Sequence, residues 1–445
     1  MANKSDDTTQ LAELCAIIDA AAAAETMGER RVASISAMID EFHAVVRDDD
    51  DDVKTVLRRR RSSSSSRKMK KRGRWWRRVD GTSRTQCSYR QIETISNGGF
   101  GVVVKAENRD TGETVAIKTL RRRGGADADA YATGVLLREA CFMAACGGNP
   151  HLVGLHGVAR NPQTKEYSLV MEYVGPSLSD AMDEHVKRHG RGNTESTVRR
   201  TMRQLLAGVE AMHGRGVIHR NIKLSNILVV DGDGDAVKIC DFGLAVSTAE
   251  AAPPCRWGGT DWYMSPEMLL EVPDYDELVD MWSLGCVMAK LLSGKALFRG
   301  EGINEQLDKI FDVVGVPGKK TRKAFESKSK LLAQKVRQWQ WRARQSSPEQ
   351  RRAGVDNRLR ELFPETMLSQ DGFEVLKGLL TFNPAKRMTA SAALRHRWFA
   401  GADDSKSGGA AALFRKATLL MFLLVGVLII AWALVRLSIG VTAGN

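Results

Sequence analysis

The sequence predicts an α+β fold, and three observations predict it. Residues 95–106 have the pattern of a strand, a tight glycine-containing turn and a second strand, and residues 114–120 that of the next strand. A helical pattern follows over residues 136–145, and a further strand over residues 168–174. A hydrophobic content of 43% with 27% charged residues indicates a packed core.

The length and the cysteines limit the class of protein. At 445 residues the chain has room for one domain of roughly 300 residues, which leaves only the two ends unexplained. The seven cysteines show neither C-x-x-C pairs nor the dense spacing of secreted disulfide scaffolds. We therefore expect reduced thiols in the cytosol or nucleus.

Residues 1–53 are predicted to be partly helical, without a secretory signal. Apolar residues recur at three- and four-residue steps in two runs, which are Leu11, Leu14 and Ile17 or Ile18, then Ile35, Met38, Ile39, Phe42, Val45 and Val46. This pattern fits a helical hairpin that docks on a partner or on the rest of the chain. The alternative is an alanine-rich region with little stable helix, because so short a hairpin is marginal in water.

Residues 54–88 form a basic, serine-rich segment that we expect to be disordered. Most of the formal net charge of +13 lies here, since twelve Lys or Arg and no Asp or Glu occur between Arg58 and Arg78. The segment fits a nuclear-import signal, a contact with anionic membranes or a nucleic-acid-binding arm. A solvated linker whose serines are phosphorylated is the alternative.

The carboxyl-terminal end predicts a membrane anchor. After a linker at 400–416, residues 417–435 are nineteen uncharged, apolar positions, which nearly span the ~30 Å hydrocarbon core of a bilayer. Arg415 and Lys416 outweigh Arg436, and a short tail at 436–445 follows. We therefore expect a transmembrane helix, a tail-anchored membrane protein and a cytosolic domain.

The middle of the chain carries a series of motifs in a fixed order. They are ISNGGFGVVVKA at 95–106, Lys118 in AIK, Glu139 in LLREACFMAA, VIHRNIKLSNILVV at 217–230, VKICDFGLA at 237–245, GTDWYMSPE at 259–267 and DMWSLGC at 280–286. This series resembles the eukaryotic protein kinases, and ALFRGEGINEQLDKIFDVVGVP at 296–317 points to the cyclin-dependent-kinase-like (CMGC) branch of serine/threonine kinases. The resemblance covers residues 89–399.

The resemblance implies a bilobal kinase fold with an N-lobe at 89–173 and a C-lobe at 174–399, and with ATP and Mg²⁺ as cofactors. Lys118, held by Glu139, would grip the α- and β-phosphates, Lys223 would neutralise the transferred phosphoryl group, and Asn226 and Asp241 would bind the metal. The residues expected to bind ATP are Ile95, Ser96, Gly98, Gly101, Val103, Ala116, Lys118, Met171, Glu172, Val174, Leu228 and Asp241. Within the C-lobe, Asp280 is expected to brace the catalytic loop and Arg387 to pair with Glu267.

Asn221 is the most important departure from the family pattern, because it stands where kinases have the aspartate that accepts the proton of the substrate hydroxyl. An amide cannot take that proton at neutral pH. Positioned general bases contribute about 10²- to 10⁴-fold in rate. We therefore expect phosphate transfer to be severely slowed, but complete loss does not follow.

Further departures concern nucleotide binding and regulation. Ser96 replaces the first glycine of the loop, and Gly99 with Phe100 replaces the pair that carries inhibitory phosphorylation. The helix sequence TGVLLRE at 133–139 shares only its last two residues with the cyclin-binding sequence, which makes cyclin a doubtful partner. The activating-threonine position falls near Cys255, and Met264 stands where proline-directed kinases usually have arginine.

Two functions remain open at this point. One is an ATP-dependent serine/threonine protein kinase of reduced activity that is tethered to a membrane. The other is a pseudokinase that binds nucleotide and acts as a switch or scaffold. The sequence names neither the protein substrate nor the client, and it leaves nucleic-acid binding through Arg58–Arg78 as a third, weaker reading.

Overall fold

The computed structural model describes residues 89–98, 101–120, 126–160, 167–248, 261–272, 275–315 and 355–400, with positions 321, 334, 337 and 338. The side chains at 126–133 and 355–357 are not described. Residues up to Leu394 belong to one compact unit and those from Arg395 onward to another. The second unit is described only around the short helix η7 (Arg397–Phe399).

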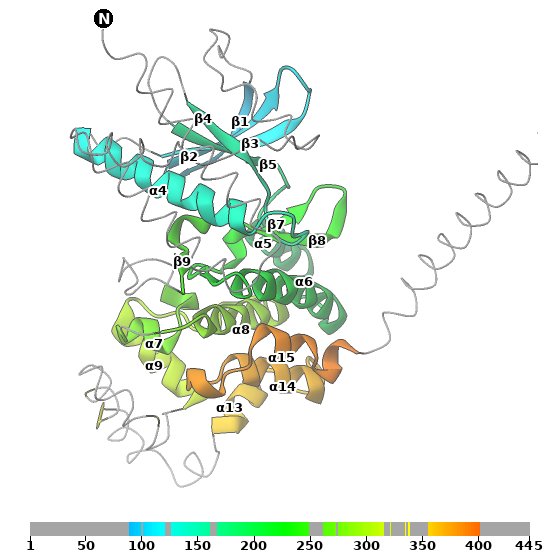
Figure 1. Cartoon of the computed structure of the whole chain (residues 1–445). Coiled ribbons are helices and arrows are strands. Elements are labelled where there is room, and N and C mark those ends of the chain that lie inside the picture. The colour runs from blue at the N-terminus through cyan, green and yellow to red at the C-terminus, as the bar shows by residue number, and fades with distance from the viewer. Residues whose placement is uncertain are drawn as a thin grey trace, which may run out of the picture. The chain divides into compact units, whose positions relative to one another are not determined.

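The amino-terminal part of the first unit is a five-stranded antiparallel sheet in the order β1-β2-β3-β5-β4 (Figure 1). The strands are β1 (Tyr89–Gly98), β2 (Gly101–Asn108), β3 (Thr114–Leu120), β4 (Leu155–Arg160) and β5 (Tyr167–Glu172). Ala106, Val115 and Val170 form a buried core cluster of the sheet. Strand β1 is an edge strand, and bulges interrupt its pairing with β2 around Ile92 and Ile95.

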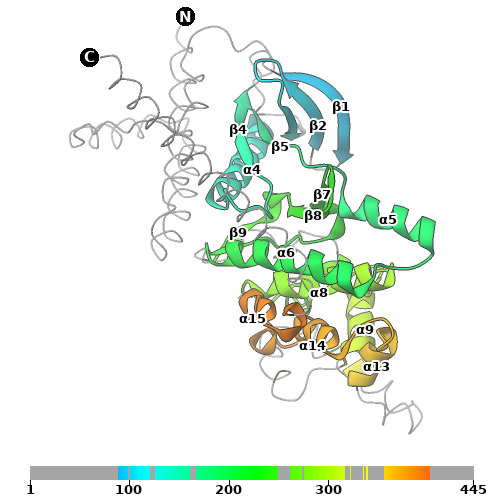
Figure 2. The same cartoon turned by 90° about the vertical axis from the view of Figure 1, so that its right-hand side faces the viewer.

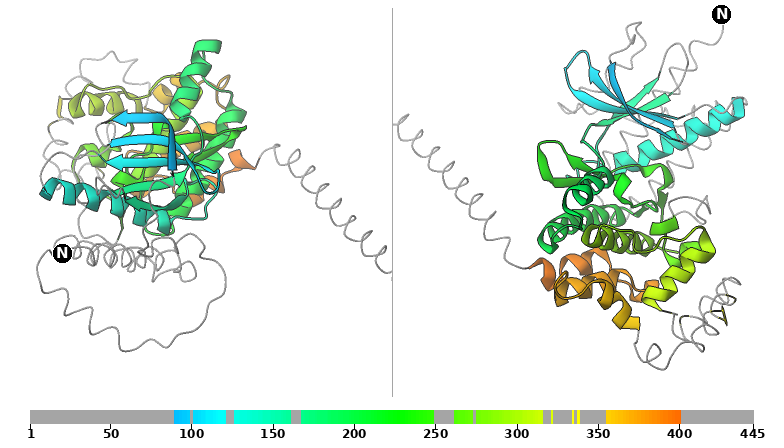
Figure 3. Two further views of the ribbon diagram at one scale, coloured as in Figure 1. Left: turned by 90° about the horizontal axis from the view of Figure 1, so that it is seen from above. Right: turned by 180° about the vertical axis from the view of Figure 1, so that it is seen from behind.

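One long helix, α4 (Ala126–Ala145), accompanies the sheet. It runs along one side of the strands when the N-lobe is viewed from above (Figure 3, left). Its main described contacts are with β3, β4, β5 and η4 (Phe242–Leu244). The helix therefore lies between the sheet and the segment around η4 that follows β8.

The chain leaves β5 at Glu172 and reaches the helical C-lobe through a short connection. Helix α5 (Leu178–His189) begins where the side chain of Ser177 accepts a hydrogen bond from the N–H of Asp180, and it ends at Gly190 in the left-handed conformation. The connection also pairs with the hairpin β7 (Ile227–Val230) and β8 (Asp233–Ile239), because the N–H of Asp231 donates to the carbonyl of Val174. Figure 2 shows this hairpin beside the start of α5.

Two buried helices form the centre of the C-lobe. They are α6 (Glu195–His213), capped by Thr194, and α8 (Leu278–Ser293), in which nearly every residue is buried. The other helices are α7 (Pro266–Leu269), α9 (Ile303–Val314), α13 (Val355–Leu362), α14 (Gln370–Leu379) and α15 (Ala390–Leu394). The short elements are β6 (Val217–Ile218), η3 (Leu224–Asn226), β9 (Val246–Ser247), η5 (Asp261–Tyr263) and η6 (Pro384–Lys386). This arrangement of a β-rich lobe and a helical lobe is the bilobal fold that the motifs predict.

The transmembrane part of the predicted fold is wrong, and with it the tail-anchored membrane localisation. Across the described ranges, no helix combines the length and the apolar character needed to cross a bilayer. The most apolar long helix in the C-lobe core, α8, has 16 residues that reach only about 24 Å, and nearly all of them are buried. The span predicted at 417–435 itself lies outside the described residues.

Several other predictions also fall outside the described part of the chain. These are the helices within 1–53, the basic segment at 54–88 with its nuclear-import and nucleic-acid readings, the turn residues Gly99 and Phe100, the position of Cys255, and the segments at 401–416 and 436–445.

Candidate active site

Lys118 lies at the centre of a buried cluster of charges. Its Nζ donates to both carboxylate oxygens of Glu139, at 2.8 Å each, and to Oδ1 of Asp241 at 2.6 Å. Strand β3 supplies the lysine, α4 supplies Glu139, and the chain after β8 supplies Asp241. The structure thus brings together three predicted site residues that are up to 123 positions apart in the sequence.

Lys118 favours the charged form of both carboxylates, although burial and the charge of Asp241 together raise the pKa of Glu139. Burial disfavours the ammonium form of Lys118, but the carboxylates of Glu139 and Asp241 outweigh burial and raise the pKa of Lys118. Burial likewise disfavours the carboxylate of Asp241, but the charge and the hydrogen bond of Lys118 hold the pKa of Asp241 below its usual value. The site therefore presents a lysine cation and an aspartate anion at neutral pH.

Two local features accompany this close packing: the backbone conformation of Asp241 and the absence of a side chain at Gly243. Asp241 adopts a φ of 67°, a left-handed conformation that is costly for a residue other than glycine. A Cβ atom at Gly243 would lie 3.3 Å from Glu139 Oε2 and 3.4 Å from Asp241 Oδ1. A side chain at this position would therefore be in tight contact with Glu139, whose carboxylate would have to move by a few tenths of an ångström.

The catalytic loop is fixed from below by Asp280 of α8. Its carboxylate accepts hydrogen bonds from the backbone N–H groups of His219 and Arg220, both at 2.8 Å, and from His213 Nε2 at 3.0 Å. The bracing role predicted for Asp280 is therefore present in the structure. Arg220 has a φ of 64°, and its Nε donates to the carbonyl of Leu244 at 2.7 Å.

His219 connects the catalytic loop to the Asp241 segment. Its Nε2 donates to the carbonyl of Cys240 at 3.1 Å, and its Nδ1 accepts the N–H of Asn221 at 3.3 Å. The ring also packs edge-on against Phe242. Burial lowers the pKa of His219, in agreement with a neutral imidazole that donates at one nitrogen and accepts at the other.

Asn221 and Asn226 lie next to each other in this loop and are almost fully buried. The side-chain amide nitrogen of Asn226 donates to the backbone carbonyl of Asn221 at 2.9 Å. This bond uses the nitrogen of Asn226, so its side-chain oxygen is the atom available to a metal ion. The side-chain oxygen of Asn221 is buried and has no hydrogen-bond partner among the residues that the structure describes, and such an orphan acceptor is costly unless a ligand satisfies it.

Lys223 follows Asn221 by two positions and stands in extended conformation before η3. Its positive charge contributes to the lowered pKa of Asp241, after the larger influence of Lys118. Lys223 is thus electrostatically coupled to the charge cluster.

The residues expected around adenine come from the sheet and the connection between the lobes. Ala116 on β3 stands opposite Met171 on β5, and each is 8% exposed. Leu228 on β7 pairs with Ser177 through an isolated bridge. Val174 is buried, and within the described part of the chain its N–H takes part in no backbone hydrogen bond, which leaves a donor for a ligand.

Glu172 departs from the expectation in one respect. Its side chain accepts a hydrogen bond from Lys238 Nζ at 2.6 Å and from the N–H of Gly154 at 3.1 Å. The carboxylate of Glu172 is therefore engaged with β8 and the segment before β4, and only its backbone is available to a nucleotide. The sequence gives no signal for this ion pair, because Glu172 and Lys238 share no motif.

The glycine-containing turn places its residues on β1 and β2. Ser96 stands opposite Val103, Gly98 stands opposite Gly101, and Val103 in turn stands opposite Lys118. Gly101 has a φ of 151°, and a side chain there would collide with the backbone of Thr119. Ile95 is 46% exposed.

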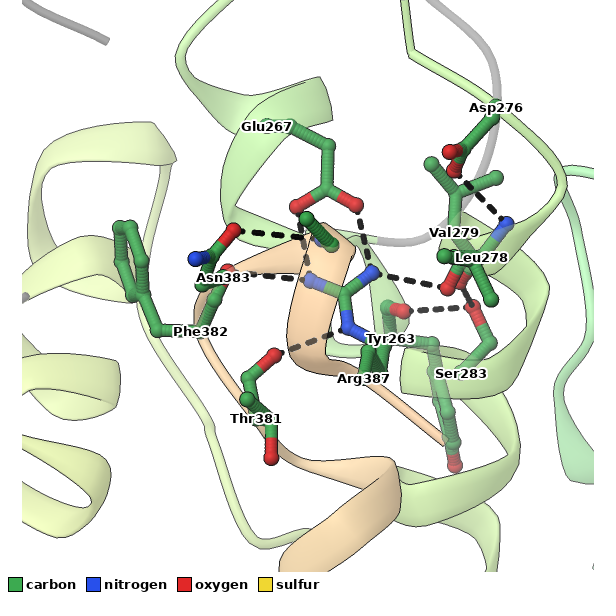
Figure 4. A network of polar contacts seen from close by, with 11 residues as sticks. Tyr263, Glu267, Asp276, Leu278, Val279, Ser283, Thr381, Phe382, Asn383 and Arg387 are labelled. Carbon is green, nitrogen blue, oxygen red and sulfur yellow. Dashed lines mark hydrogen bonds and ion pairs between the residues drawn. The ribbon is translucent and has the colours of Figure 1, made fainter. Parts of the chain in front are cut away.

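A second buried ion pair, between Arg387 and Glu267, lies in the interior of the C-lobe (Figure 4). The guanidinium of Arg387 donates to Glu267 Oε1 at 2.5 Å and Oε2 at 2.9 Å, as the sequence predicts. It also donates to the carbonyls of Leu278, Phe382 and Thr381. Each N–H group of the guanidinium therefore has an acceptor. Through these bonds Arg387 connects α7 with the start of α8 and with the chain after α14.

The donor set fits Mg²⁺ bound together with a phosphate ligand. Within the described ranges, no group of three or more His, Cys, Asp or Glu side chains could hold a metal unaided. Mg²⁺ prefers one or two protein oxygens with substrate phosphates and waters. The oxygens of Asn226 and Asp241 match that preference.

Comparison with known proteins agrees with the geometry. Residues 89–399 match the protein kinase domain family. A protein of Oryza sativa subsp. japonica named putative cyclin-dependent kinase F-2 is 43% identical over 324 residues, which are 71% of this chain and 90% of that protein. Cyclin-dependent kinase G-2 of Oryza sativa subsp. indica is 33% identical over 323 residues, and cyclin-dependent kinase G1 of Arabidopsis thaliana 34% over 330 residues.

The two G-type relatives are longer than the shared part. The matched region is 71% of this chain in both cases, but it spans only 42% of the G-2 protein and 50% of the G1 protein. The family match covers most of this chain, and the F-2 relative is matched over nearly its whole length. The chain therefore belongs to the protein kinases, within the cyclin-dependent-kinase-like group of serine/threonine kinases.

Proposed function

We propose that this chain binds ATP with Mg²⁺ and transfers the γ-phosphate to serine or threonine of a protein, at a rate reduced by Asn221. The observation that carries the proposal is the buried cluster of Lys118, Glu139 and Asp241. The side chains of Lys118 and Glu139 are buried, and that of Asp241 is 36% exposed. Burying charges is costly even when they are paired, and such groups often mark functional sites. In this family the corresponding groups grip and align nucleotide phosphates.

The assignment of roles follows from the positions of the side chains. Lys118 would hold the α- and β-phosphates, and Asn226 with Asp241 would hold the metal, which supplies charge neutralisation when it is bound. Ala116, Met171 and Val174 would surround the adenine, with the N–H of Val174 as a donor. The kinase domain would extend over residues 89–399, with the change of lobe at 173 and 174.

Asn221 would still orient the substrate hydroxyl, although it could not accept the proton of that hydroxyl. Its unpartnered side-chain oxygen can accept a hydrogen bond from a substrate hydroxyl and so orient it. It cannot take the proton as the hydroxyl oxygen forms its bond to phosphorus and the bond to ADP breaks. The proton then leaves to a phosphoryl oxygen or to water, which is slower than transfer to a positioned base.

A pseudokinase is the second candidate, and Asn221 is the observation that favours it. In that case the chain would bind nucleotide without useful transfer and would act on a client as a switch or scaffold. The intact charge cluster supports nucleotide binding under both proposals. Only a measurement of phosphate transfer distinguishes the kinase from the pseudokinase.

The relatives are named cyclin-dependent kinases. For this chain we keep cyclin as a doubtful partner, because TGVLLRE at 133–139 shares little with the cyclin-binding sequence. The protein substrate or client stays open.

Nucleotide binding is tested by thermal unfolding of the full chain. Millimolar ATP with Mg²⁺ should raise the melting temperature, because a ligand that binds only the folded state stabilises it by mass action. The conservative variant Asp241→Asn should lose most of this shift. A folded wild-type sample whose melting temperature does not move would remove ATP and Mg²⁺ from the proposal.

A further inference from the structure

Glu172, the last residue of β5, is held by residues that lie 18 and 66 positions away in the sequence. Its Oε1 accepts a hydrogen bond from Lys238 Nζ of β8 at 2.6 Å, and its Oε2 accepts one from the N–H of Gly154 at 3.1 Å. The N–H of Glu172 donates in turn to the carbonyl of Gly154 at 2.9 Å. Three hydrogen bonds therefore fix both the backbone and the side chain of Glu172, and two of them involve its carboxylate.

The hairpin of β7 and β8 binds the chain before and after Glu172. On β8, Ile239 exchanges two backbone hydrogen bonds of 2.9 Å with residues 151–153, which lead into β4. From β7 and the turn that follows it, backbone N–H groups donate to the carbonyls of Val174 and Pro176, also at 2.9 Å. Figure 2 shows the hairpin between the sheet and α6. The C-lobe thus holds both segments that flank the end of β5.

The ion pair between Lys238 and Glu172 is better shielded from water than a second pair on the same strand. The side chains of Lys238 and Glu172 are 18% and 34% exposed. Those of Arg200 and Asp235, which pair at 3.2 Å, are 39% and 65% exposed. Attraction between charges weakens with exposure to solvent. We therefore expect Lys238 to restrain Glu172, while the pair at Asp235 contributes little.

This restraint concerns adenine, because the backbone beside it is expected to bind the base. Under the proposed function, the carbonyl of Glu172 would accept from the amino group of adenine, and the N–H of Val174 would donate to a ring nitrogen. Guanine has the acceptor O6 where adenine has this amino donor. A carbonyl of Glu172 that cannot turn away would therefore face a second acceptor in guanine, and polar groups left unpaired weaken binding. A carbonyl that can turn would tolerate guanine better.

We propose that Lys238 and the side chain of Glu172 are positioning residues that hold the end of β5 in the arrangement that selects adenine over guanine. Lys238 acts through Glu172 and does not touch the nucleotide. This inference rests on the proposed function, because it concerns the same nucleotide site, and it adds the residues that set the base specificity of that site. It applies to the kinase and to the pseudokinase alike, since it does not require phosphate transfer.

The ratio of the dissociation constants for GTP and ATP tests the role of the pair. In the full chain, Lys238→Met removes the ion pair from one side and Glu172→Gln removes it from the other, so either folded variant decides the question. Competition against a fluorescent ATP analogue, with Mg²⁺ present, measures both constants. Each variant should lower the ratio by about threefold to tenfold, which is the effect of one hydrogen bond. A general structural loss would weaken both nucleotides equally and leave the ratio unchanged.

Two control variants keep the ratio of wild type if the proposal holds. Lys238→Arg retains the charge and the donor, and Asp235→Asn removes the exposed ion pair of the same strand. A ratio in Lys238→Met or Glu172→Gln within about twofold of wild type overturns this proposal alone, provided that wild type binds ATP. Equal affinity of wild type for ATP and GTP overturns it as well. Wild type that binds neither nucleotide overturns the proposed function together with this inference.

Discussion

Lys118 holds a positive charge that the N-lobe buries between two carboxylates. Its side chain is 11% exposed, and that of Glu139 is 1% exposed. Removing one partner of a buried ion pair leaves the other charge without compensation, which is more costly than the net gain from forming the pair. The charge cluster is therefore a point at which one substitution affects both stability and function.

Lys118→Met should lower the free energy of unfolding by about 3–5 kcal/mol, because Glu139 and Asp241 are left facing each other without a cation. Urea unfolding of the full chain measures it. Lys105→Met on β2 is the matched control, since Lys105 pairs with the exposed Glu93 at 3.6 Å, and surface pairs contribute little. Equal losses in both variants would contradict the burial argument.

Asn221→Asp should raise the rate of phosphate transfer by about 10²- to 10⁴-fold. The two side chains have nearly the same size, so His219 and Asn226 keep their hydrogen bonds to the backbone of residue 221. Single-turnover transfer from labelled ATP at matched folding measures the gain. An unchanged rate would mean that the loop or the charge cluster is misassembled for other reasons, and it would favour a scaffold.

At the level of the elements, α8 and the catalytic loop form one unit through Asp280. Burial opposes the ionisation of Asp280, but the hydrogen bond and charge of His213 and the N–H of His219 outweigh burial and hold the pKa of Asp280 below its usual value. A folded-state pKa below the unfolded one means that the carboxylate stabilises the fold above the unfolded pKa of about 3.9. That stabilisation is lost as the pH falls further, through the folded pKa.

Asp280→Asn should therefore flatten the acid limb of the stability profile. Between about pH 5 and pH 3, the free energy of unfolding of wild type should fall more steeply than that of the variant, because only wild type must protonate this carboxylate. Asp235→Asn, at an exposed partner of Arg200, serves as control and should keep the wild-type slope. Parallel profiles for wild type and Asp280→Asn would show that the carboxylate is not held ionised by the fold.

The elements that the sequence predicted well are those with a regular pattern or a fixed motif. Strand β3 is expected at Thr114–Leu120 and observed there, since β-branched residues alternate with others along it. The contact between Arg387 and Glu267 is expected from two motifs far apart and observed in the structure.

Other features depend on the whole molecule and leave no pattern in the sequence. The bond between Glu172 and Lys238 joins residues 66 positions apart, and only the assembled lobes bring them together. The left-handed backbones of Arg220 and Asp241 leave no pattern in the sequence either, since arginine rarely adopts that conformation and even aspartate, which adopts it more often than most residues, does so uncommonly. An apolar run such as 417–435 predicts burial of its side chains, but the run alone does not identify the environment that buries them.

At the scale of the whole molecule, the charge cluster around Lys118 is connected through the Cys240–Asp241 segment to a catalytic loop that has Asn221 in place of a proton-accepting aspartate. We predict that this site performs slow transfer that depends on Lys118, rather than no transfer. The direct test is transfer from γ-labelled ATP to a generic protein substrate by the full chain, with Lys118→Met measured beside it. The account predicts a low signal from wild type that clearly exceeds the signal from Lys118→Met. Equal signals from the two proteins would contradict it.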